Sequence, residues 1–157
     1  MSDFSQLDVN ANQRAHVHVR NFDPARDLEV CQKIYQVARA AAFYWIDPKK
    51  FRLKDFSADI KGEYVAVAEE INRAVVGFVG IWSPDHFIHH LYVLPDRQRR
   101  GIGRALLDHA LAQIGRPARL KCQRRNRNAC EFYTHLGWRQ GETGYDSIGD
   151  WIEFLFD

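Results

Sequence analysis

The sequence lacks the features that mark several specialised classes of protein. Its net charge is only +2 over 157 residues, so the protein as a whole is not strongly basic. This disfavours nucleic acid as a partner, and any function of basic residues must come from a local cluster. Cysteine is scarce, and the three present, Cys31, Cys122 and Cys130, show no Cys-x-x-Cys spacing. Their odd number argues against a disulfide framework and the missing spacing argues against a zinc site, so we expect reduced thiols and no metal.

Segments that would export or anchor the protein are also missing from the sequence. The first residues contain no basic leader followed by an apolar run, which is the pattern of a secretory signal peptide. No apolar run approaches the roughly 20 residues that span a bilayer. We therefore expect a cytoplasmic protein with no membrane partner.

What the sequence does contain is enough apolar material for a core. Hydrophobic residues make up 46% of it and aromatic residues 13%, which predicts a single domain over residues 1–157, with residues 1–14 as a mobile arm. Periodicity predicts strands at residues 17–22, 63–68, 75–82, 87–94, 118–122, 138–140 and 151–156, helices at 23–42, 103–114 and 129–136, and a shorter helix or turn at 47–60. This order predicts an α/β (α+β) fold in which helices cover both faces of a mixed sheet.

One stretch, residues 96–107, places four arginines around two glycines between an expected strand and an expected helix: D-R-Q-R-R-G-I-G-R-A-L-L. Such a turn suits phosphate, because unpaired N–H groups and the helix dipole point out of the helix start. A Walker loop is excluded because no Gly-Lys-Ser/Thr follows. A dinucleotide-binding turn is excluded because Leu106 stands where its third glycine should be. On this stretch alone, a solvated basic helix start is an equal alternative.

Two longer segments narrow the choice. Residues 91–107 read L-Y-V-L-P-D-R-Q-R-R-G-I-G-R-A-L-L, and residues 126–138 read N-R-N-A-C-E-F-Y-T-H-L-G-W. The first resembles the acyl-CoA-binding strand and Q/R-x-x-G-x-G/A turn of the GNAT superfamily of N-acetyltransferases. The second resembles the superfamily's N-x-x-A-x-x-F/L-Y-x-x-L-G-F segment, except that Trp138 replaces the last phenylalanine. The resemblance extends from about residue 63 to the C-terminus.

This resemblance implies a GNAT-like fold and a reaction. The sheet would be mixed and mostly antiparallel, with the central strands 87–94 and 118–122 splayed apart to admit acetyl-CoA. The protein would transfer an acetyl group from acetyl-CoA to a primary amine by direct attack through a tetrahedral intermediate. The acceptor would be a small molecule or a peptide amine. Dimers are common in the superfamily, which slightly favours a homodimer.

The resemblance also implies which residues bind acetyl-CoA. The pantetheine arm pairs with strand backbone in the superfamily, here that of Leu91, Tyr92 and Val93, and an N–H near Leu91 would polarise the thioester carbonyl. Asn126 would hydrogen-bond the pantetheine arm. The pyrophosphate would lie on backbone N–H groups of the turn, with the arginine side chains adding long-range attraction. The turn consists of Gln98, Arg99, Arg100, Gly101, Ile102, Gly103 and Arg104.

Two residues are candidates for proton transfer. Tyr133 occupies the position where the superfamily places a hydroxyl near the thioester sulfur, so it is the expected general acid, although its spacing alone would favour a core tyrosine. His89 falls where amine-acetylating relatives can carry a histidine, a residue type that titrates in the range a general base needs. We expect His89 and the adjacent His90 to point to opposite faces. Two alternatives to His89 as the base stay open: it is an ordinary strand histidine, or water relays the proton. Phe87 stands where some members of the superfamily carry a carboxylate.

The sequence leaves open which residues line the acceptor pocket and which of the competing functions the protein has. Cys130 lies in the second segment and is expected to be structural, because direct transfer needs no thiol nucleophile. The competing function is a non-catalytic module that senses acyl-CoA or holds RNA on its basic surface, which the low net charge disfavours. Aromatic residues that could line the pocket, each expected by default to belong to the core, are Phe43, Tyr44, Trp45, Trp82, Trp138 and Trp151.

Overall fold

The computed structural model describes residues 16–157, so the predicted mobile arm lies outside the described residues. The strands are β1 (Val17–Asn21), β2 (Tyr64–Glu70), β3 (Val75–Trp82), β4 (Phe87–Val93), β5 (Ala118–Gln123), β6 (Arg139–Tyr145) and β7 (Asp150–Phe156). The α-helices are α2 (Pro24–Ala42), α3 (Asp55–Asp59), α4 (Ile102–Ile114) and α5 (Arg127–His135). Short 3-10 helices are η1 (Pro48–Lys50), η2 (Ser83–Asp85) and η3 (Pro95–Arg97). Across residues 16–157, no helix is long and apolar enough to cross a membrane.

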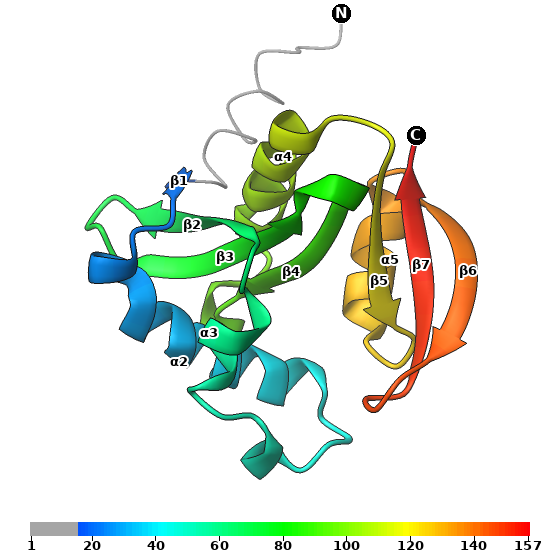
Figure 1. The fold of residues 1–157 in the computed structure, drawn as a ribbon, viewed down its shortest axis with the longest axis horizontal. Coiled ribbons are helices and arrows are strands. Elements are labelled where there is room, and N and C mark those ends of the chain that lie inside the picture. The colour runs from blue at the N-terminus through cyan, green and yellow to red at the C-terminus, as the bar shows by residue number, and fades with distance from the viewer. Residues whose placement is uncertain (1–15) are drawn as a thin grey trace, which may run out of the picture.

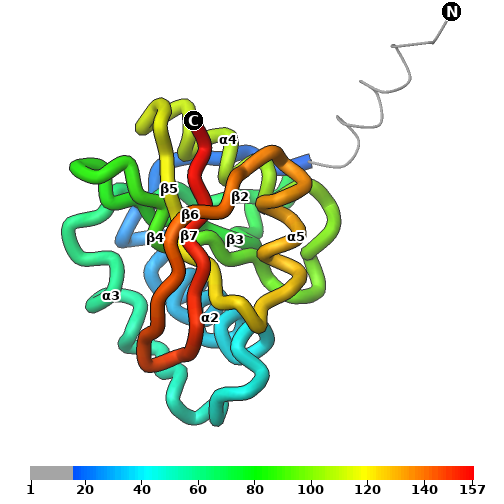
Figure 2. Tube along the Cα trace, turned by 90° about the vertical axis from the view of Figure 1, so that its right-hand side faces the viewer, coloured from blue at the N-terminus to red at the C-terminus, as the bar shows by residue number. Residues whose placement is uncertain are grey.

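The seven strands form one sheet in the order β1-β2-β3-β4-β5-β7-β6. All neighbours are antiparallel except β4 and β5, which run parallel and pair only at Phe87–Arg119 and Ile88–Leu120. Past these two pairs the strands separate, and Figure 1 shows β5, β7 and β6 turned away from β2, β3 and β4. Figure 2, seen from the side of β6, shows the β5–β7–β6 part in front of the remaining strands. The predicted mixed, mostly antiparallel sheet that opens between its central strands is confirmed.

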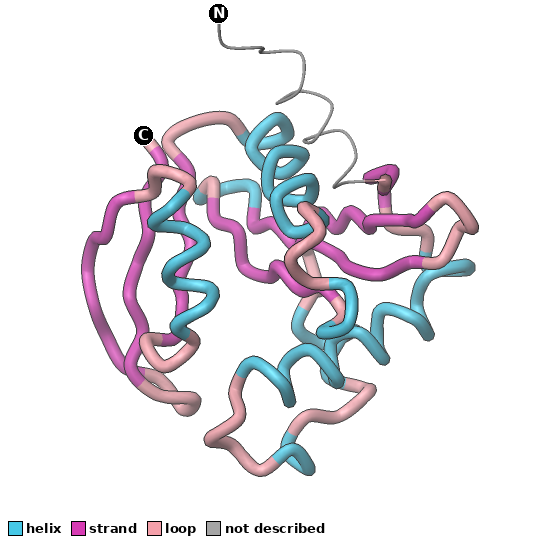
Figure 3. The backbone as a smooth tube through the Cα atoms, turned by 180° about the vertical axis from the view of Figure 1, so that it is seen from behind, coloured by secondary structure: helices cyan, strands magenta, loops and turns pink. Residues whose placement is uncertain are grey.

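Helices cover both faces of this sheet because its inner strands bury side chains on both sides. Val67 of β2 packs with Ile34 of α2 on one face. Its neighbour Ala66 belongs to the core on the other face, together with Leu106 of α4 and Tyr133 of α5. Figure 3, seen from behind, shows α4 and α5 as the two helices in front of the strands. Successive strand residues point to opposite faces, so a strand that is covered twice must be apolar at nearly every position.

Local signals set the helix boundaries much as the sequence predicted. The Asp23 carboxylate caps α2 by accepting a hydrogen bond from the Ala25 N–H at 3.1 Å, and Pro24 occupies the first helical position. Helix α4 follows Gly101, whose φ is 83°, and ends at Gly115, whose φ is 76°. Both angles lie in the left-handed region, which glycine adopts without steric conflict.

Strand β6 is longer than the sequence predicted. The expected strand covered residues 138–140, whereas β6 runs over Arg139–Tyr145 at the edge of the sheet and pairs with β7. Six of its seven residues are exposed, so no alternation of apolar and polar residues marks it. Trp138, which the prediction placed in this strand, precedes it and is buried in the core.

Candidate active site

A cavity of about 570 Å³ lies where β4 and β5 separate. Its walls come from β4, β5, α5, helices α2 and α3, β7 and the loop between β6 and β7. Among the expected catalytic and acetyl-CoA-binding residues, those lining it are His89, Leu91, Tyr92, Asn126 and Tyr133. Val93 is buried in the core instead, and the turn of residues 98–104 lies beyond the end of β4, outside this lining.

Tyr133 belongs to the cavity wall and to the core at once. It is 7% exposed, and its ring packs against Trp138 and Phe154 with centroid distances of 5.8 and 5.6 Å. Burial, and to a lesser extent the neighbouring Cys122 and Tyr92, raise the pKa of its hydroxyl. The phenol therefore keeps its proton at neutral pH. The two interpretations of this residue, core tyrosine and site residue, do not exclude each other.

His89 and His90 lie side by side, so the prediction that they point to opposite faces is wrong. Their ring centroids are 4.0 Å apart. Gly80 of β3 pairs with His90, but the next residue, Ile81, pairs with Ile88, which leaves His89 as an extra residue in β4. This β-bulge interrupts the alternation of side chains on which the prediction depended.

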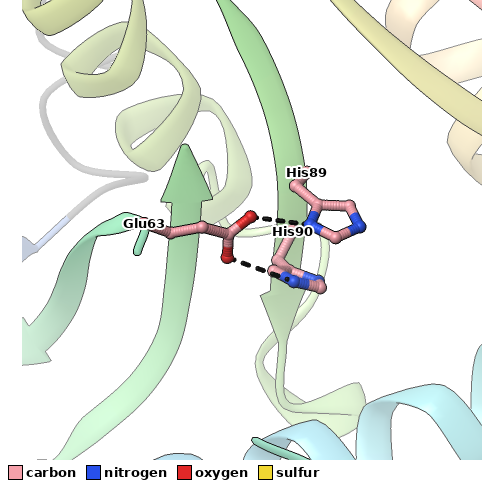
Figure 4. Close-up of side chains that lie close together, drawn as sticks. All are labelled: Glu63, His89 and His90. Atoms are coloured by element: carbon pink, nitrogen blue, oxygen red, sulfur yellow. Dashed lines mark hydrogen bonds and ion pairs between the residues drawn. The ribbon is translucent and has the colours of Figure 1, made fainter. Parts of the chain in front are cut away.

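Both histidine rings meet Glu63, a residue that sequence reasoning missed. Glu63 directly precedes β2, and its side chain is only 3% exposed. Its Oε1 accepts a hydrogen bond from Nδ1 of His89 at 2.6 Å, and its Oε2 lies 3.3 Å from Nε2 of His90 (Figure 4). Burial acts to raise the pKa of this carboxyl group, but the hydrogen bonds and charges of the two histidines lower it to about 2. The sequence signal was a single acidic residue at the start of an apolar strand, which is too common to indicate a site.

Gly80 has no side chain, and this leaves room for the cluster of Glu63, His89 and His90. A Cβ atom on Gly80 would lie 3.0 Å from Cδ2 of His90 and 3.1 Å from Oε2 of Glu63. The His89 side chain is 49% exposed, and its Nε2 lies on the side of the ring away from Glu63 (Figure 4). Because a carboxylate can only accept, Nδ1 of a neutral His89 carries the hydrogen and Nε2 carries the lone pair. The cluster thus presents a proton acceptor at the cavity.

The same three side chains could also hold a metal ion. Glu63, His89 and His90 place one ligand atom each within 4.8 Å of the others, and they form the group of this kind found among residues 16–157. Two imidazoles and a carboxylate suit zinc and similar divalent cations. The sequence predicted no metal here. In the structure Glu63 and His89 are joined by a direct hydrogen bond without an ion.

The turn before α4 presents backbone N–H groups to a ligand. No side chain caps the start of α4, and the first N–H groups of a helix have no intrahelical acceptor. Arg99, with φ of 63°, and Gly101 give the turn its left-handed bends. A Cβ atom on Gly103 would meet only Phe132 and Val93, at 3.8 and 4.0 Å, so the surroundings of Gly103 are open. This geometry suits an anion.

Another part of the cavity wall is aromatic and contains a paired cation. The wall includes Tyr35, Phe43 and Phe51. The Arg39 guanidinium lies 3.7 Å from the centroid of the Tyr35 ring and 4.9 Å from that of Phe51, and it contacts the Asp55 carboxylate at 3.1 Å. Arg39 is therefore held in place and its charge is balanced within the wall.

The six aromatic candidates for the acceptor pocket separate into four groups. Phe43 and Trp151 line the cavity, and Trp138 lies in the core as expected. Tyr44 and Trp82 are 73% and 41% exposed, so the expectation of core is wrong for these two. Trp45 donates a hydrogen bond from Nε1 to the carbonyl oxygen of Ile148 at 2.8 Å, which joins the loop after α2 to the loop between β6 and β7.

Asn126, at the start of α5, caps that helix by accepting a hydrogen bond from the Ala129 N–H at 3.4 Å.

Comparison with known proteins agrees with this geometry. A family model described as the acetyltransferase (GNAT) family matches residues 28–138, a range that includes both segments singled out in the sequence. The chain belongs to the GNAT acetyltransferase family. No curated protein matches the chain.

Solved structures show that this GNAT acetyltransferase has the family's fold. The apo form of YjaB from Escherichia coli superposes with a TM-score of 0.73 and 17% identity, over 89% of this chain and 97% of that one. The PaiA N-acetyltransferase from Thermoplasma acidophilum, in complex with coenzyme A, gives 0.72 and 16%, over 89% and 99%. YncA from Salmonella typhimurium, with its cofactor acetyl-CoA, gives 0.65 and 22%, over 90% and 93%. Identities this low establish the fold and leave the substrate open.

Proposed function

We propose that this protein transfers an acetyl group from acetyl-CoA to a primary amine, which attacks the thioester directly. His89 is the general base, Glu63 positions it, and Tyr133 is the general acid. The observation that carries the proposal is that Tyr133 and the Glu63-bound His89 line one cavity at the opening between β4 and β5. The acceptor is a small molecule or a peptide bearing the amine.

The cavity and the turn before α4 fit acetyl-CoA. Strand β4 has no pairing with β5 beyond Ile88, so that edge of the backbone at residues 91–93 is available to a pantetheine arm in the manner of an added strand. The N–H groups of residues 101–104 suit the pyrophosphate, and Asn126 lies on the cavity wall within the same opening. Coenzyme A and acetyl-CoA in the PaiA and YncA structures support this assignment. When bound, acetyl-CoA supplies the activated acetyl group.

His89 removes a proton from the attacking amine. Its Nδ1–H donates to Glu63, which leaves the lone pair of Nε2 on the half-exposed side of the ring. The ionised Glu63 fixes this tautomer and stabilises the imidazolium that forms when Nε2 takes up the proton. Glu63 acts through His89 and is therefore a positioning residue. A relay through water is the alternative that the pH–rate profile tests.

Tyr133 and the β4 backbone act on the other side of the reaction. The Tyr133 hydroxyl, kept protonated by burial, donates its proton to the sulfur that leaves. An N–H near Leu91 donates a hydrogen bond where negative charge develops on the carbonyl oxygen. We also propose that residues 1–157 form one domain, because strands from both ends of the described chain share one sheet. A homodimer and a cytoplasmic location stay predictions from the sequence.

The test is the release of the free thiol of CoA from acetyl-CoA over a panel of small amines and peptides. We expect thiol release that requires both the protein and a primary amine, and an amine product that gains the mass of one acetyl group. His135→Gln is the matched control, because His135 is an exposed histidine on α5 outside the cavity lining. This variant should turn over as the wild type does.

Thermal unfolding separates binding from catalysis. Acetyl-CoA at 100 times its dissociation constant should stabilise the protein by about 2.7 kcal/mol. If acetyl-CoA stabilises the protein but no amine is acetylated, the catalytic proposal fails and the acyl-CoA-sensing alternative is supported. If acetyl-CoA has no effect while RNA binds in a salt-sensitive manner, the RNA-binding alternative is supported.

A further inference from the structure

Two thiols that the proposed reaction does not use are in contact beside the cavity. Cys122 lies on β5 and lines the cavity, Cys130 lies on α5, and their Sγ atoms are 3.4 Å apart. Both are free thiols in the structure. Each Sγ also lies near the carbonyl oxygen of Gln123, at 3.7 Å for Cys122 and 3.5 Å for Cys130. The junction between β5 and α5 therefore holds the two sulfur atoms together.

The two thiols differ in their access to solvent and in their acidity. Cys122 is 6% exposed, whereas Cys130 is only partly buried. The contact with Cys122 and the positive charge of Arg124 lower the pKa of the Cys130 thiol, while burial opposes them. A thiolate that a small oxidant can reach is the form of cysteine that reacts. Cys130 is thus placed to react first and Cys122 second.

We propose that Cys122 and Cys130 form a redox modification site, at which a hydroperoxide converts the two thiols to an intrachain disulfide that slows acetyl transfer. The Cys130 thiolate attacks one oxygen of hydrogen peroxide, the O–O bond breaks, and the products are a sulfenic acid and, after protonation, one water. The Cys122 sulfur then attacks the Cys130 sulfur, the S–O bond breaks, and the second water leaves with the thiol proton. Two thiols are oxidised and the peroxide is reduced to two molecules of water.

The disulfide would change the wall of the cavity. Disulfide sulfurs bond at about 2 Å, closer than the present contact, so β5 and the first turns of α5 must move together. Asn126 caps α5, and Tyr133 lies three residues after Cys130 on the same helix. A displacement of about 1 Å at a reacting group can slow an enzyme by up to roughly 100-fold. This effect on activity rests on the proposed function, whereas the chemistry at the thiols does not.

Cys31 provides an internal control for this chemistry. It is 0% exposed and lies on α2, where it belongs to the core on the opposite face of the sheet together with Phe56 of α3. Burial raises the pKa of its thiol to about 12. We therefore expect Cys31 to stay reduced under conditions that oxidise the other two cysteines.

The experiment treats the full chain with hydrogen peroxide, unfolds it, alkylates the remaining thiols and determines the mass. Of the three cysteines in the wild type, one should remain alkylatable, and peptide mapping should link Cys122 to Cys130 within a single chain. A thiol reductant should restore all three. After peroxide treatment, Cys31→Ala should have no alkylatable thiol, because its two remaining cysteines form the disulfide. Cys130→Ser should form no disulfide, so both of its remaining thiols should stay alkylatable. Mapping the wild type keeps the test valid if a variant fails to fold.

Activity of the same samples distinguishes the two proposals. Turnover of the wild type should fall roughly tenfold or more on oxidation and return on reduction, and Cys130→Ser should be insensitive to peroxide. Three alkylatable thiols after treatment, or a disulfide that includes Cys31 or joins two chains, would refute the modification site. A disulfide without any change in turnover would refute its effect on the reaction. A disulfide in a protein whose reduced form acetylates no amine would instead refute the proposed function.

Discussion

Nδ1 of His89 and Oε1 of Glu63 lie 2.6 Å apart, although the two residues are 26 positions apart in the chain. The carboxylate comes from the start of β2 and the imidazole from the bulge in β4, with β3 between these strands in the sheet. A buried carboxylate that accepts the Nδ1 hydrogen of a half-exposed imidazole fixes the tautomer of the ring. This pair supports the proposal that His89 is the general base.

Replacing His89 with glutamine should remove the ascending limb of the pH–rate profile. Glutamine cannot accept the proton of the amine, so we expect kcat to fall by roughly 10²- to 10⁴-fold while the affinity for acetyl-CoA is retained. The measurement is kcat across the pH range in which histidine titrates, beside wild type and the His135→Gln control. Retention of the same ascending limb in His89→Gln would assign the base to water or to another group.

Replacing Glu63 with glutamine should lower kcat and leave the KM for acetyl-CoA unchanged. The neutral amide no longer stabilises the imidazolium that His89 forms, and loss of such a partner has a large effect on the rate of other acid–base pairs. Glu142→Gln, an exposed position on β6, is the matched control. A variant that lost affinity for acetyl-CoA and turnover together would indicate that Glu63 supports the fold of the site and does not position the base.

The same variant should change the stability of the protein at acid pH. The Glu63 carboxyl has a pKa of about 2, below its ordinary value of 4.5, so it contributes stability above pH 4.5 that is lost as the pH falls towards 2. We expect the free energy of unfolding of wild type to exceed that of Glu63→Gln by up to about 3 kcal/mol near neutral pH, and the difference to shrink towards pH 2. Urea unfolding across this range measures it, and a difference that is constant with pH would contradict the assignment.

Replacing Tyr133 with phenylalanine should lower turnover much more than it lowers the affinity for acetyl-CoA. The substitution keeps the packing of the ring against Trp138 and Phe154 and removes only the proton donor, so we expect kcat to fall by roughly 10²-fold or more. Tyr145→Phe is the control, because Tyr145 is 79% exposed on the edge strand β6. Turnover of Tyr133→Phe equal to that of wild type would leave Tyr133 as a core residue alone.

Adding a methyl group at Gly80 should disturb the base without touching the acetyl-CoA site. The new Cβ would meet His90 and Oε2 of Glu63 at about 3 Å, so the Glu63 side chain must shift and His89 loses its partner. We expect Gly80→Ala to lower kcat by roughly tenfold or more. In the Glu63→Gln background the same change should have a much smaller effect, because the two substitutions act on one interaction. Additive effects in this cycle would mean that Gly80→Ala acts through something other than Glu63.

A proline at position 103 should weaken acetyl-CoA binding, because proline removes one backbone N–H from the start of α4. That N–H has no intrahelical acceptor, so its loss affects the helix little. Loss of one hydrogen bond to a charged group corresponds to roughly 10-fold or more in affinity. Gly103→Ala, which keeps the N–H and has room for its Cβ, should bind nearly as well as wild type. If Arg104→Gln weakened binding more than Gly103→Pro, the arginine side chains would dominate the turn.

The sequence predicted the parts of the site that depend on local chain geometry. A strand, a turn with Gly101 and Gly103, and a helix follow one another in a short segment, so their juxtaposition is set by chain connectivity. The position of Tyr133 on a helix followed from the spacing of apolar residues around it. The sequence predicted only the first residues of the edge strand β6, because an exposed strand has no apolar alternation that would indicate its length.

Glu63 and the arrangement of His89 beside His90 could not be predicted in this way. A bulge depends on how two strands pair, and the one-residue shift between Gly80 and Ile81 leaves no mark in the sequence of β4 itself. Strict alternation therefore assigned the histidines to opposite faces. Only the assembled sheet places Glu63, Gly80 and both rings in one cluster.

The sequence by itself determined that this protein has a mixed sheet with helices on both faces, a glycine-containing turn before α4 and the motifs of a GNAT acetyltransferase. Those features depend on periodicity, glycine positions and contiguous motifs, all of which are local. The tertiary structure decided which groups lie together in and beside the cavity: it turned His89 towards Glu63, buried Tyr133 and brought Cys122 into contact with Cys130. Contacts of this kind depend on strand register and on packing between distant segments, which a linear pattern does not record.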